Sequence, residues 1–353
     1  PRLRCLACGR TFSTQTFAAS YYCKRPDILS RVARYLTNGA ADRPGRRILA
    51  PDPRYAPHRD VGAAASTVSR LVSRLGRHCI LVKNELRAPL ARARPARLTT
   101  CVADDFETFA ATQLNAVSVA TVVDQRSAFI VALDQAAHRR GGLRTPAQHD
   151  AERRLEEAGQ LPDPAARAHA WTRVAEHLHR DAPGAPPLVL HDGDPTLADA
   201  LRRQGLPARA YPNPTRGPKG SPRSAAARQR DAAMREIDLL HRLFRHALAH
   251  DRRESIAFAR SVNALLQRKF IFAVAHDLIQ PRRERRRHEG TPAMLLGLAA
   301  APLSWEDLLE RRRFLADGPP LPPGWADAYH ERIRTLGRAP SARRRPQFAG
   351  TPR

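Results

Sequence analysis

The spacing of apolar residues predicts helices towards both ends of the chain and strands in its middle. Between residues 26 and 90 apolar side chains recur every three or four positions, as at Ile28, Val32 and Leu36, which is the period of an amphipathic helix. From about Leu98 the pattern changes to short apolar runs separated by polar turns, which predict three consecutive antiparallel strands. These runs are RLTTCVAD, AVSVATVVD and SAFIVALDQA.

A fourth strand and further helices follow. Residues 146–181 have a helical pattern, and the sequence PLVLHDGDP then predicts a buried strand that ends abruptly in acids. Residues 212–230 are rich in Pro, Gly and Arg without any period, which predicts a mobile basic loop. Amphipathic helices resume near Ile237 and Val262. Strands followed by helices and a further strand predict an α/β fold, a mixed sheet with flanking helices.

These patterns divide the chain into five parts. We expect a cysteine-containing segment, a helical region, an α/β domain that includes the basic loop, a helical C-terminal extension and a disordered basic tail. In chain order they cover residues 1–25, 26–92, 96–280, 281–335 and 336–353.

Charge favours a nucleic-acid partner. Sixty Lys and Arg against 34 Asp and Glu give a net charge of +26, and such a surface attracts polyanions. A GC-rich genome also raises the arginine content, and an RNA-associated structural protein would carry the same charge. Acids gathered at a few strand ends, and an aromatic content of only 6%, argue against the RNA protein. No apolar run is long enough for a membrane span, so we expect a bacterial cytoplasmic, nucleoid-associated protein.

The first cysteines have the spacing of half a zinc site. Cys5 and Cys8 can occupy two corners of a zinc tetrahedron, and Gly9 permits the tight turn that aims backbone amides at the sulfurs. Two more ligands are required, and because the chain begins without Met we expect a second cysteine pair upstream of Pro1. Two unligated cysteines in a surface loop are the alternative. The later cysteines, Cys23, Cys79 and Cys101, are expected to be packing residues.

The second helix of the 26–92 region has a basic face. Ser66 or Thr67 is expected to cap it, after a Pro- and Arg-rich loop at residues 42–60. It is either the DNA-reading helix of a helix-turn-helix or an ordinary amphipathic helix packed on its neighbour, since that loop is longer than the usual turn. The arginines of its basic face are Arg70, Arg74 and Arg77.

Two acids directly follow predicted strands. If the strands that precede Asp104 and Asp192 are neighbours, both carboxylates can bind the same divalent cations, for which Mg²⁺ prefers oxygen ligands. Glu254 supplies a third acid on a helix, and the positive charges of Arg252 and Arg253 beside it favour its ionised form. Three carboxylates could hold metal ions that promote in-line phosphodiester displacement.

Six segments of the chain also resemble, in order, the signature segments of an insertion-sequence transposase family. In that family a zinc ribbon and a helix-turn-helix precede an RNase H-like, integrase-like catalytic domain of the DDE type. The segments are ADDFETF at 103–109, AFIVALDQA at 128–136, GLRTPAQ at 142–148, HDGDP at 191–195, HDRRESIAFAR at 250–260 and TPAMLLGL at 291–298.

The resemblance implies that Asp104, Asp192 and Glu254 are the catalytic metal-binding acids, with Asp105 and Asp194 as the alternative ligands. It further implies Mg²⁺- or Mn²⁺-dependent cleavage and strand transfer at the inverted repeats of a DNA element, by a homo-oligomer bound to double-stranded DNA. The zinc ribbon is incomplete and the helix-turn-helix is interrupted. These departures favour an alternative interpretation, a catalytically inactive DNA-binding protein derived from such a transposase. The arginines expected to contact DNA are Arg70, Arg74, Arg77, Arg252 and Arg253.

Overall fold

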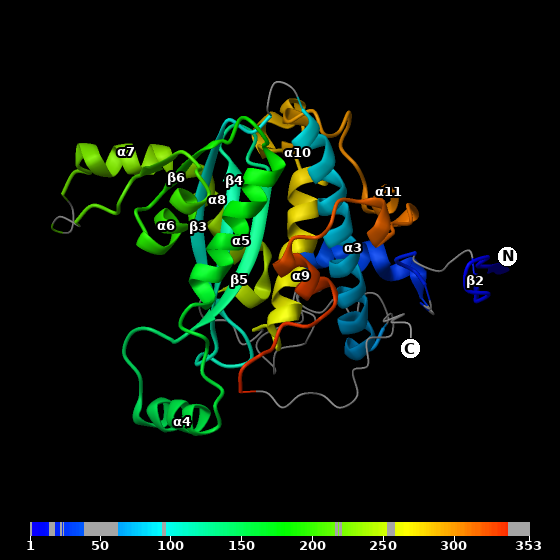
Figure 1. Ribbon diagram of the computed structural model, residues 1–353, viewed down its shortest axis with the longest axis horizontal. Helices are drawn as coiled ribbons and strands as arrows, with labels where there is room; N and C mark the ends of the chain where they lie inside the picture. Colours follow the sequence, from blue (N-terminus) through cyan, green and yellow to red (C-terminus); the bar gives the residue numbers. More distant parts are fainter. Residues whose placement is uncertain are drawn as a thin grey trace.

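The protein is described by a computed structural model, shown in Figure 1. Glu254, Arg253 and the Arg- and Pro-rich loop at 42–60 lie outside the described residues, as does all but the start of the tail predicted at 336–353. The residues that the structure describes are 2–13, 18–21, 23, 25–38, 63–93, 97–215, 218, 221–252 and 258–337.

A mixed five-stranded sheet forms the centre of the molecule, with the order β5-β4-β3-β6-β7. The three predicted antiparallel strands are confirmed, and the fourth strand, β6, pairs in parallel with β3 rather than with its sequence neighbour β5. β7 then adds to β6, also in parallel. The strands are β3 (Thr100–Phe109), β4 (Ala116–Asp124), β5 (Ile130–His138), β6 (Leu188–His191) and β7 (Ala208–Ala210).

Two helices cover one face of this sheet. The chain crosses from β5 to β6 through α4 (Pro146–Glu157) and α5 (Ala166–Asp181), and from β6 to β7 through α6 (Pro195–Arg203). α5 and α6 pack against one another, with α5 lying in front of the strands in Figure 1, whereas α4 stands away from the sheet. Buried Trp171 and Leu197 anchor the two helices in the core.

α8 (Arg235–Ala247) packs against β3 and β4, and it contacts α9 (Val262–Val274). Before it, α7 (Ala225–Ala233) begins inside the segment predicted as a loop at 212–230. The prediction was wrong for these residues because the Ser224 hydroxyl accepts a hydrogen bond from the Ala227 N–H at 3.1 Å and caps the helix.

The N-terminal helices join the same core. A hairpin of β1 (Arg2–Arg4) and β2 (Thr11–Ser13) precedes a short turn of helix, η1 (Pro26–Ile28), and α1 (Leu29–Thr37). The hairpin stands apart at the N-terminal end of Figure 1, whereas α3 (Ala65–Arg92) runs beside α9.

α3 is tied to the sheet by a buried lysine. Lys83 donates to the Ile130 carbonyl at 2.6 Å and forms an ion pair with Asp277 just beyond α9. The expected side-chain cap of this helix was wrong: α3 begins at Ala65, before Ser66 and Thr67, and no side chain caps it. The helical region predicted at 26–92 therefore shares its hydrophobic core with the sheet.

Short helices complete the C-terminal part. Trp325 on α12 (Pro323–Tyr329) donates to the Leu133 carbonyl of β5 at 2.8 Å and so closes this edge of the fold. Within the described ranges no helix is long and apolar enough to cross a membrane. The remaining elements are η3 (Ala249–Asp251), η4 (Ala275–Ile279), η5 (Glu284–Glu289), α10 (Pro292–Leu295), α11 (Trp305–Glu310), η6 (Leu315–Asp317) and α12 (Pro323–Tyr329).

Candidate active site

Parallel pairing brings Asp104 and Asp192 side by side. Ala103 of β3 is opposite His191 of β6, and an acid follows each of them. Neighbouring strands are about 4.8 Å apart, so the two acids leave adjacent backbones. The prediction that Asp104 directly follows its strand was wrong, because pairing with β4 carries β3 on to Phe109. It is β6 that ends here, at His191.

The surroundings of Asp104 disfavour its negative charge. Burial raises the pKa of this carboxyl to about 7, and the charges of Asp192 and, to a smaller extent, Asp238 on α8 add to the effect. His241, also on α8, places Nδ1 3.7 Å from Asp104 Oδ2. That pair is not ionic at neutral pH, because burial and nearby cations lower the pKa of His241 to about 3. A cation bound between Asp104 and Asp192 would relieve this repulsion.

Asp105, the first alternative ligand, points to the opposite face of the sheet, as strand alternation requires. There its Oδ2 accepts hydrogen bonds from Arg167 Nε at 2.7 Å and from Trp171 Nε1 at 3.0 Å, both on α5. The Ser118 hydroxyl donates to the other carboxylate oxygen. These contacts anchor α5 on the sheet and leave Asp105 no room for a metal ion.

Asp194, the second alternative, is the N-cap of α6. Its Oδ1 accepts from the backbone N–H groups of Thr196 at 2.9 Å and Leu197 at 3.0 Å, and its Oδ2 lies 2.9 Å from Arg167. Within the described part of the chain, Asp192 accepts one hydrogen bond, from the Asp194 N–H at 3.0 Å. Of the four neighbouring acids, Asp104 and Asp192 are therefore the pair open to a ligand.

The sequence interpretation missed two residues of this site, Asp238 and His241. They lie three positions apart on α8, so they share a face of the helix, and this spacing of polar residues within an apolar helical pattern was the signal available. Asp238 forms an ion pair with Arg230 of α7 (3.3 Å between Nη2 and Oδ1). Among the described residues no group of three or more His, Cys, Asp or Glu side chains is arranged to hold a metal ion.

The cysteine pair occupies the turn of the N-terminal hairpin. Gly9 has a φ of +69°, and its N–H donates to the Cys5 carbonyl at 2.8 Å, so the predicted tight turn is confirmed. Hydrogen bonds from the Cys8 backbone and thiol and from the Ala7 backbone lower the pKa of Cys5. A thiolate held by backbone amides suits a zinc ligand, and the zinc itself stays a prediction.

The arginines of the predicted reading helix do not form one exposed row. Arg70 is exposed, whereas Arg74 is partly buried and donates to the Cys23 sulfur at 3.4 Å. From Leu75 onwards α3 buries its apolar face against α9. This packing is what we expected of an ordinary amphipathic helix, the alternative to a DNA-reading helix. Arg77 is also partly buried, and DNA contact by these residues stays a prediction.

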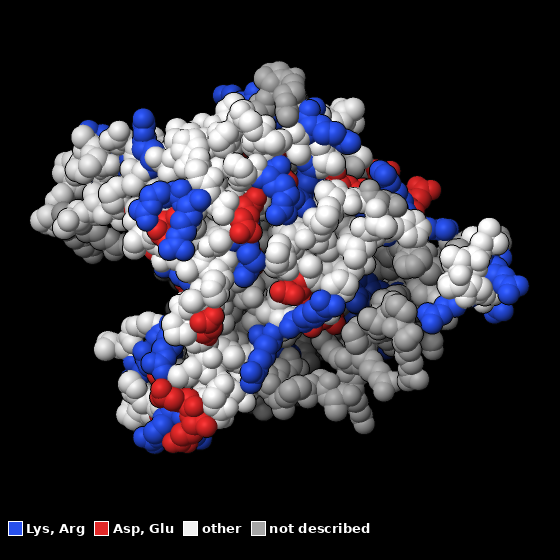
Figure 2. Space-filling view, viewed as in Figure 1, with Lys and Arg blue, Asp and Glu red and all other residues white. Residues whose placement is uncertain are grey.

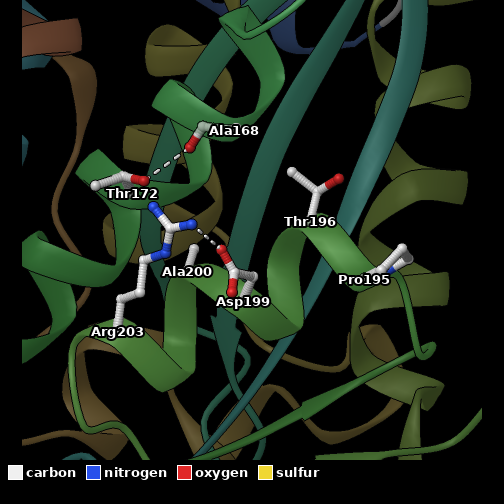
Figure 3. Close-up of a pocket in the computed structure, with 7 residues that line it drawn as sticks. All are labelled: Ala168, Thr172, Pro195, Thr196, Asp199, Ala200 and Arg203. Carbon is white, nitrogen blue, oxygen red and sulfur yellow. Dashed lines mark hydrogen bonds and ion pairs between the residues drawn. The ribbon is translucent and has the colours of Figure 1, made fainter.

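A hollow lies on the far side of the sheet from Asp104. It has a volume of about 320 Å³ between α5 and α6, and its lining includes Ala168, Thr172 and Ala200. Figure 3 shows that Arg203, also at its edge, points to Asp199, with which it forms an ion pair of 2.7 Å. Its charged groups satisfy one another, so we do not assign it a role in the candidate site.

Replacing Asp104 by Asn should stabilise the metal-free protein at alkaline pH. The folded protein keeps the Asp104 proton up to about pH 7, whereas the unfolded chain releases it near 3.8, so wild-type stability falls as the pH rises between these values. D104N lacks this charge. We expect its free energy of unfolding to exceed that of the wild type by about 4 kcal/mol above pH 7. Urea titrations should show the difference vanishing below about pH 4; an equal difference at both pH values would contradict the assignment.

No protein-family model and no curated protein matches this chain. A functional conclusion therefore depends on the geometry of the site and on the sequence resemblance.

Proposed function

We propose that this protein is a DNA transposase that cleaves and transfers DNA strands at the ends of its element in a metal-dependent reaction. The observation that carries the proposal is the juxtaposition of Asp104 and Asp192 on adjacent parallel strands, with the pKa of Asp104 raised to about 7 by burial and by Asp192. A strongly perturbed carboxyl beside a second acid is typical of a functional site.

The sheet supports an RNase H-like assignment for this domain. Its first three strands are antiparallel, the chain then crosses through helices to β6 in parallel with β3, and the two acids come from these two central strands. Helices lie on both faces, α5 and α6 on one and α8 on the other. This arrangement is the one that the resemblance to DDE transposases leads us to expect.

The acid pair would hold Mg²⁺ or Mn²⁺. Carboxylate oxygens are the ligands these ions prefer, and Asp104 and Asp192 are the two acids whose oxygens are not committed to an arginine or a helix cap. The bound metal would activate a water or a 3′-hydroxyl and stabilise the leaving oxygen. Glu254, which the resemblance implies as the third ligand, lies outside the described residues and stays a prediction.

The net charge of +26 supports a DNA partner. On the face shown in Figure 2, Lys and Arg side chains are spread among Asp and Glu side chains instead of forming a single patch. Attraction of the duplex would then come from the summed charge. We retain binding of inverted repeats and target DNA by a homo-oligomer as part of the proposal.

The proposal is tested by nicking of a supercoiled plasmid that carries the element ends. We expect cleavage with Mg²⁺ or Mn²⁺, none with EDTA, and none with D104N. The matched control is D199N, which removes an acid from the surface of α6 that only pairs with arginines and should cut like the wild type. Plasmid binding without metal-dependent nicking by the wild type would refute the enzyme and leave the inactive DNA-binding protein.

A further inference from the structure

The segment at residues 281–290, between η4 and α10, has the sequence PRRERRRHEG, and nothing above assigns it a role. Five of the six residues from Arg282 to Arg287 are arginines. Residues 284–288 are exposed, and we call the whole segment the arginine turn. None of its arginines is among those that the sequence predicted to contact DNA, so the turn is a separate candidate surface.

The backbone of the arginine turn closes on itself. The Arg282 N–H donates to the Gly290 carbonyl at 3.0 Å, and the Gly290 N–H donates to the Arg287 carbonyl at 3.2 Å. Gly290 has a φ of +83°, and a Cβ atom at this position would lie 2.9 Å from Met294 Cε, so the turn needs a glycine here. Because the fold already orders this backbone, a ligand that binds the arginines orders little more than their side chains.

Acids balance only part of the charge of the arginine turn. Three carboxylates pair with four of its five arginines. The pairs are Arg282–Glu236, Arg283–Glu289, Arg286–Glu289 and Arg287–Glu284. Arg285 is exposed, and no acid of the described chain pairs with it. Two positive charges are therefore in excess. Exposed ion pairs such as Arg287–Glu284 contribute little to stability, so their arginines are available to an anion outside the protein.

The arginine turn lies next to the acid pair along α8. Arg282 Nη2 is 3.3 Å from Oε1 of Glu236, in the first turn of that helix. His241, whose Nδ1 is 3.7 Å from Asp104, follows Glu236 by five residues, a rise of about 7.5 Å. Duplex DNA carries one negative charge for roughly every 1.7 Å of its axis. A duplex that lies on the arginine turn therefore also has phosphates level with Asp104.

The composition of the arginine turn favours duplex DNA among the polyanions. The segment contains no aromatic residue, whereas proteins that bind single-stranded nucleic acid stack its bases on aromatic rings. Residues 284–288 include no apolar side chain, and segments that lie on membranes combine basic with apolar residues. Guanidinium groups match the oxygens of phosphate in geometry and charge. The phosphate backbone of a duplex needs only such contacts.

We propose that the arginine turn binds the phosphate backbone of double-stranded DNA beside the acid pair, through the exposed side chains of Arg285, Arg286 and Arg287. The inference rests on the proposed transposase function and names the surface that holds the uncut duplex next to the cleavage site. Binding to this surface needs no metal ion, so it can be measured in EDTA, separately from cleavage.

The first test uses the two halves of one ion pair. R287Q and E284Q both break the Arg287–Glu284 pair, but they change the charge of the turn in opposite directions. The measurement is the anisotropy of a labelled duplex that carries the element end, in EDTA. At about 0.1 M salt we expect R287Q to bind roughly tenfold more weakly and to lose about one phosphate contact from the salt dependence. E284Q should bind more tightly. Weaker binding by both variants would give the pair a structural role and overturn the proposal.

R139Q and E156Q are the matched controls. Arg139 and Glu156 form an ion pair of 3.1 Å in which both side chains are also more than half exposed. Glu156 is on α4, which lies at the opposite end of the sheet from α10, the helix that follows the arginine turn (Figure 1). We expect these two substitutions to leave duplex binding close to that of the wild type. Effects equal to those of R287Q and E284Q would show that only the overall charge matters and would overturn the proposal.

A second set of ligands tests the choice of duplex DNA. Binding of R287Q and the wild type is compared for the duplex, for a single strand of the same length and for vesicles that contain phosphatidylserine. A larger loss for the single strand or the vesicles than for the duplex would overturn the proposal. Nicking separates this inference from the proposed function. Duplex binding that depends on Arg287 in a protein that does not nick would refute only the cleavage, whereas nicking by a protein whose duplex binding is unchanged by R287Q would overturn only the role of the turn.

Discussion

Asp192→Asn is expected to lower metal-dependent strand cleavage by a factor of about a thousand or more, without unfolding the protein. Loss of an outer partner of a metal ligand typically costs roughly 10- to 100-fold, and Asp192 is proposed to bind the metal directly. Its carboxylate accepts a hydrogen bond from the Asp194 N–H, which the Asn oxygen can still accept. The measurements are single-turnover nicking with Mn²⁺ and the binding of Mn²⁺ itself.

Asp194→Asn is the matched control two residues away. It leaves an N-cap, since Asn caps helices about as well as Asp, but weakens the ion pair with Arg167. We expect a modest loss of stability and at most about a tenfold loss of cleavage, consistent with an indirect role. A larger loss of cleavage for Asp194→Asn than for Asp192→Asn would identify Asp194 as the metal ligand and contradict the geometry described above.

Lys269→Met is expected to lower the free energy of unfolding by about 3–5 kcal/mol, because it leaves a buried carboxylate without its partner. Lys269 and Asp251 are both fully buried and ion-paired, and the lysine lies over the rings of Phe106 at 3.7 Å and Phe244 at 3.6 Å. The methionine keeps much of the packing but removes the charge. Urea denaturation at neutral pH measures the loss.

A surface pair provides the comparison for this result. Arg287 and Glu284 form an ion pair with both side chains largely exposed, so Arg287→Met should change stability by less than about 1 kcal/mol. Similar effects for the two substitutions would show that Asp251 is solvated or protonated once Lys269 is absent. The double variant K269M/D251N should recover part of the loss, since no unpaired buried charge then remains.

Local periodicity was sufficient to predict the elements of the sheet. The apolar runs that begin at Leu98 are strands: every position of β4 and the first five positions of β5 are buried, and β3 buries Cys101, Val102, Ala103 and Phe106. The acids could be placed near one another because the apolar run of β6 stops immediately before Asp192. Those parts of the prediction needed only information within about ten residues of each position.

Partners distant in sequence could not be predicted in this way. Asp104 and Asp105 are adjacent residues of the same type, so the sequence does not tell which of them is the ligand. The packing of α5 distinguishes them, because it brings Arg167 against Asp105. Similarly, Asp238 approaches Asp104 because α8 packs across the sheet. The length of β3 beyond Asp104 depends on pairing with β4, which outweighs the low strand propensity of two consecutive aspartates.

The buried contact of Lys83 on α3 with Asp277 beyond α9 has a consequence for how this protein can change in evolution. Removal of the residues before about position 96 would remove the lysine and leave Asp277 as an uncompensated charge in the interior. It would also expose the apolar face of α9. The N-terminal helices are therefore not an exchangeable module. A recombinant that grafts another protein's N-terminal region onto this sheet should fold only if it also inherits a matching α9 and its acid.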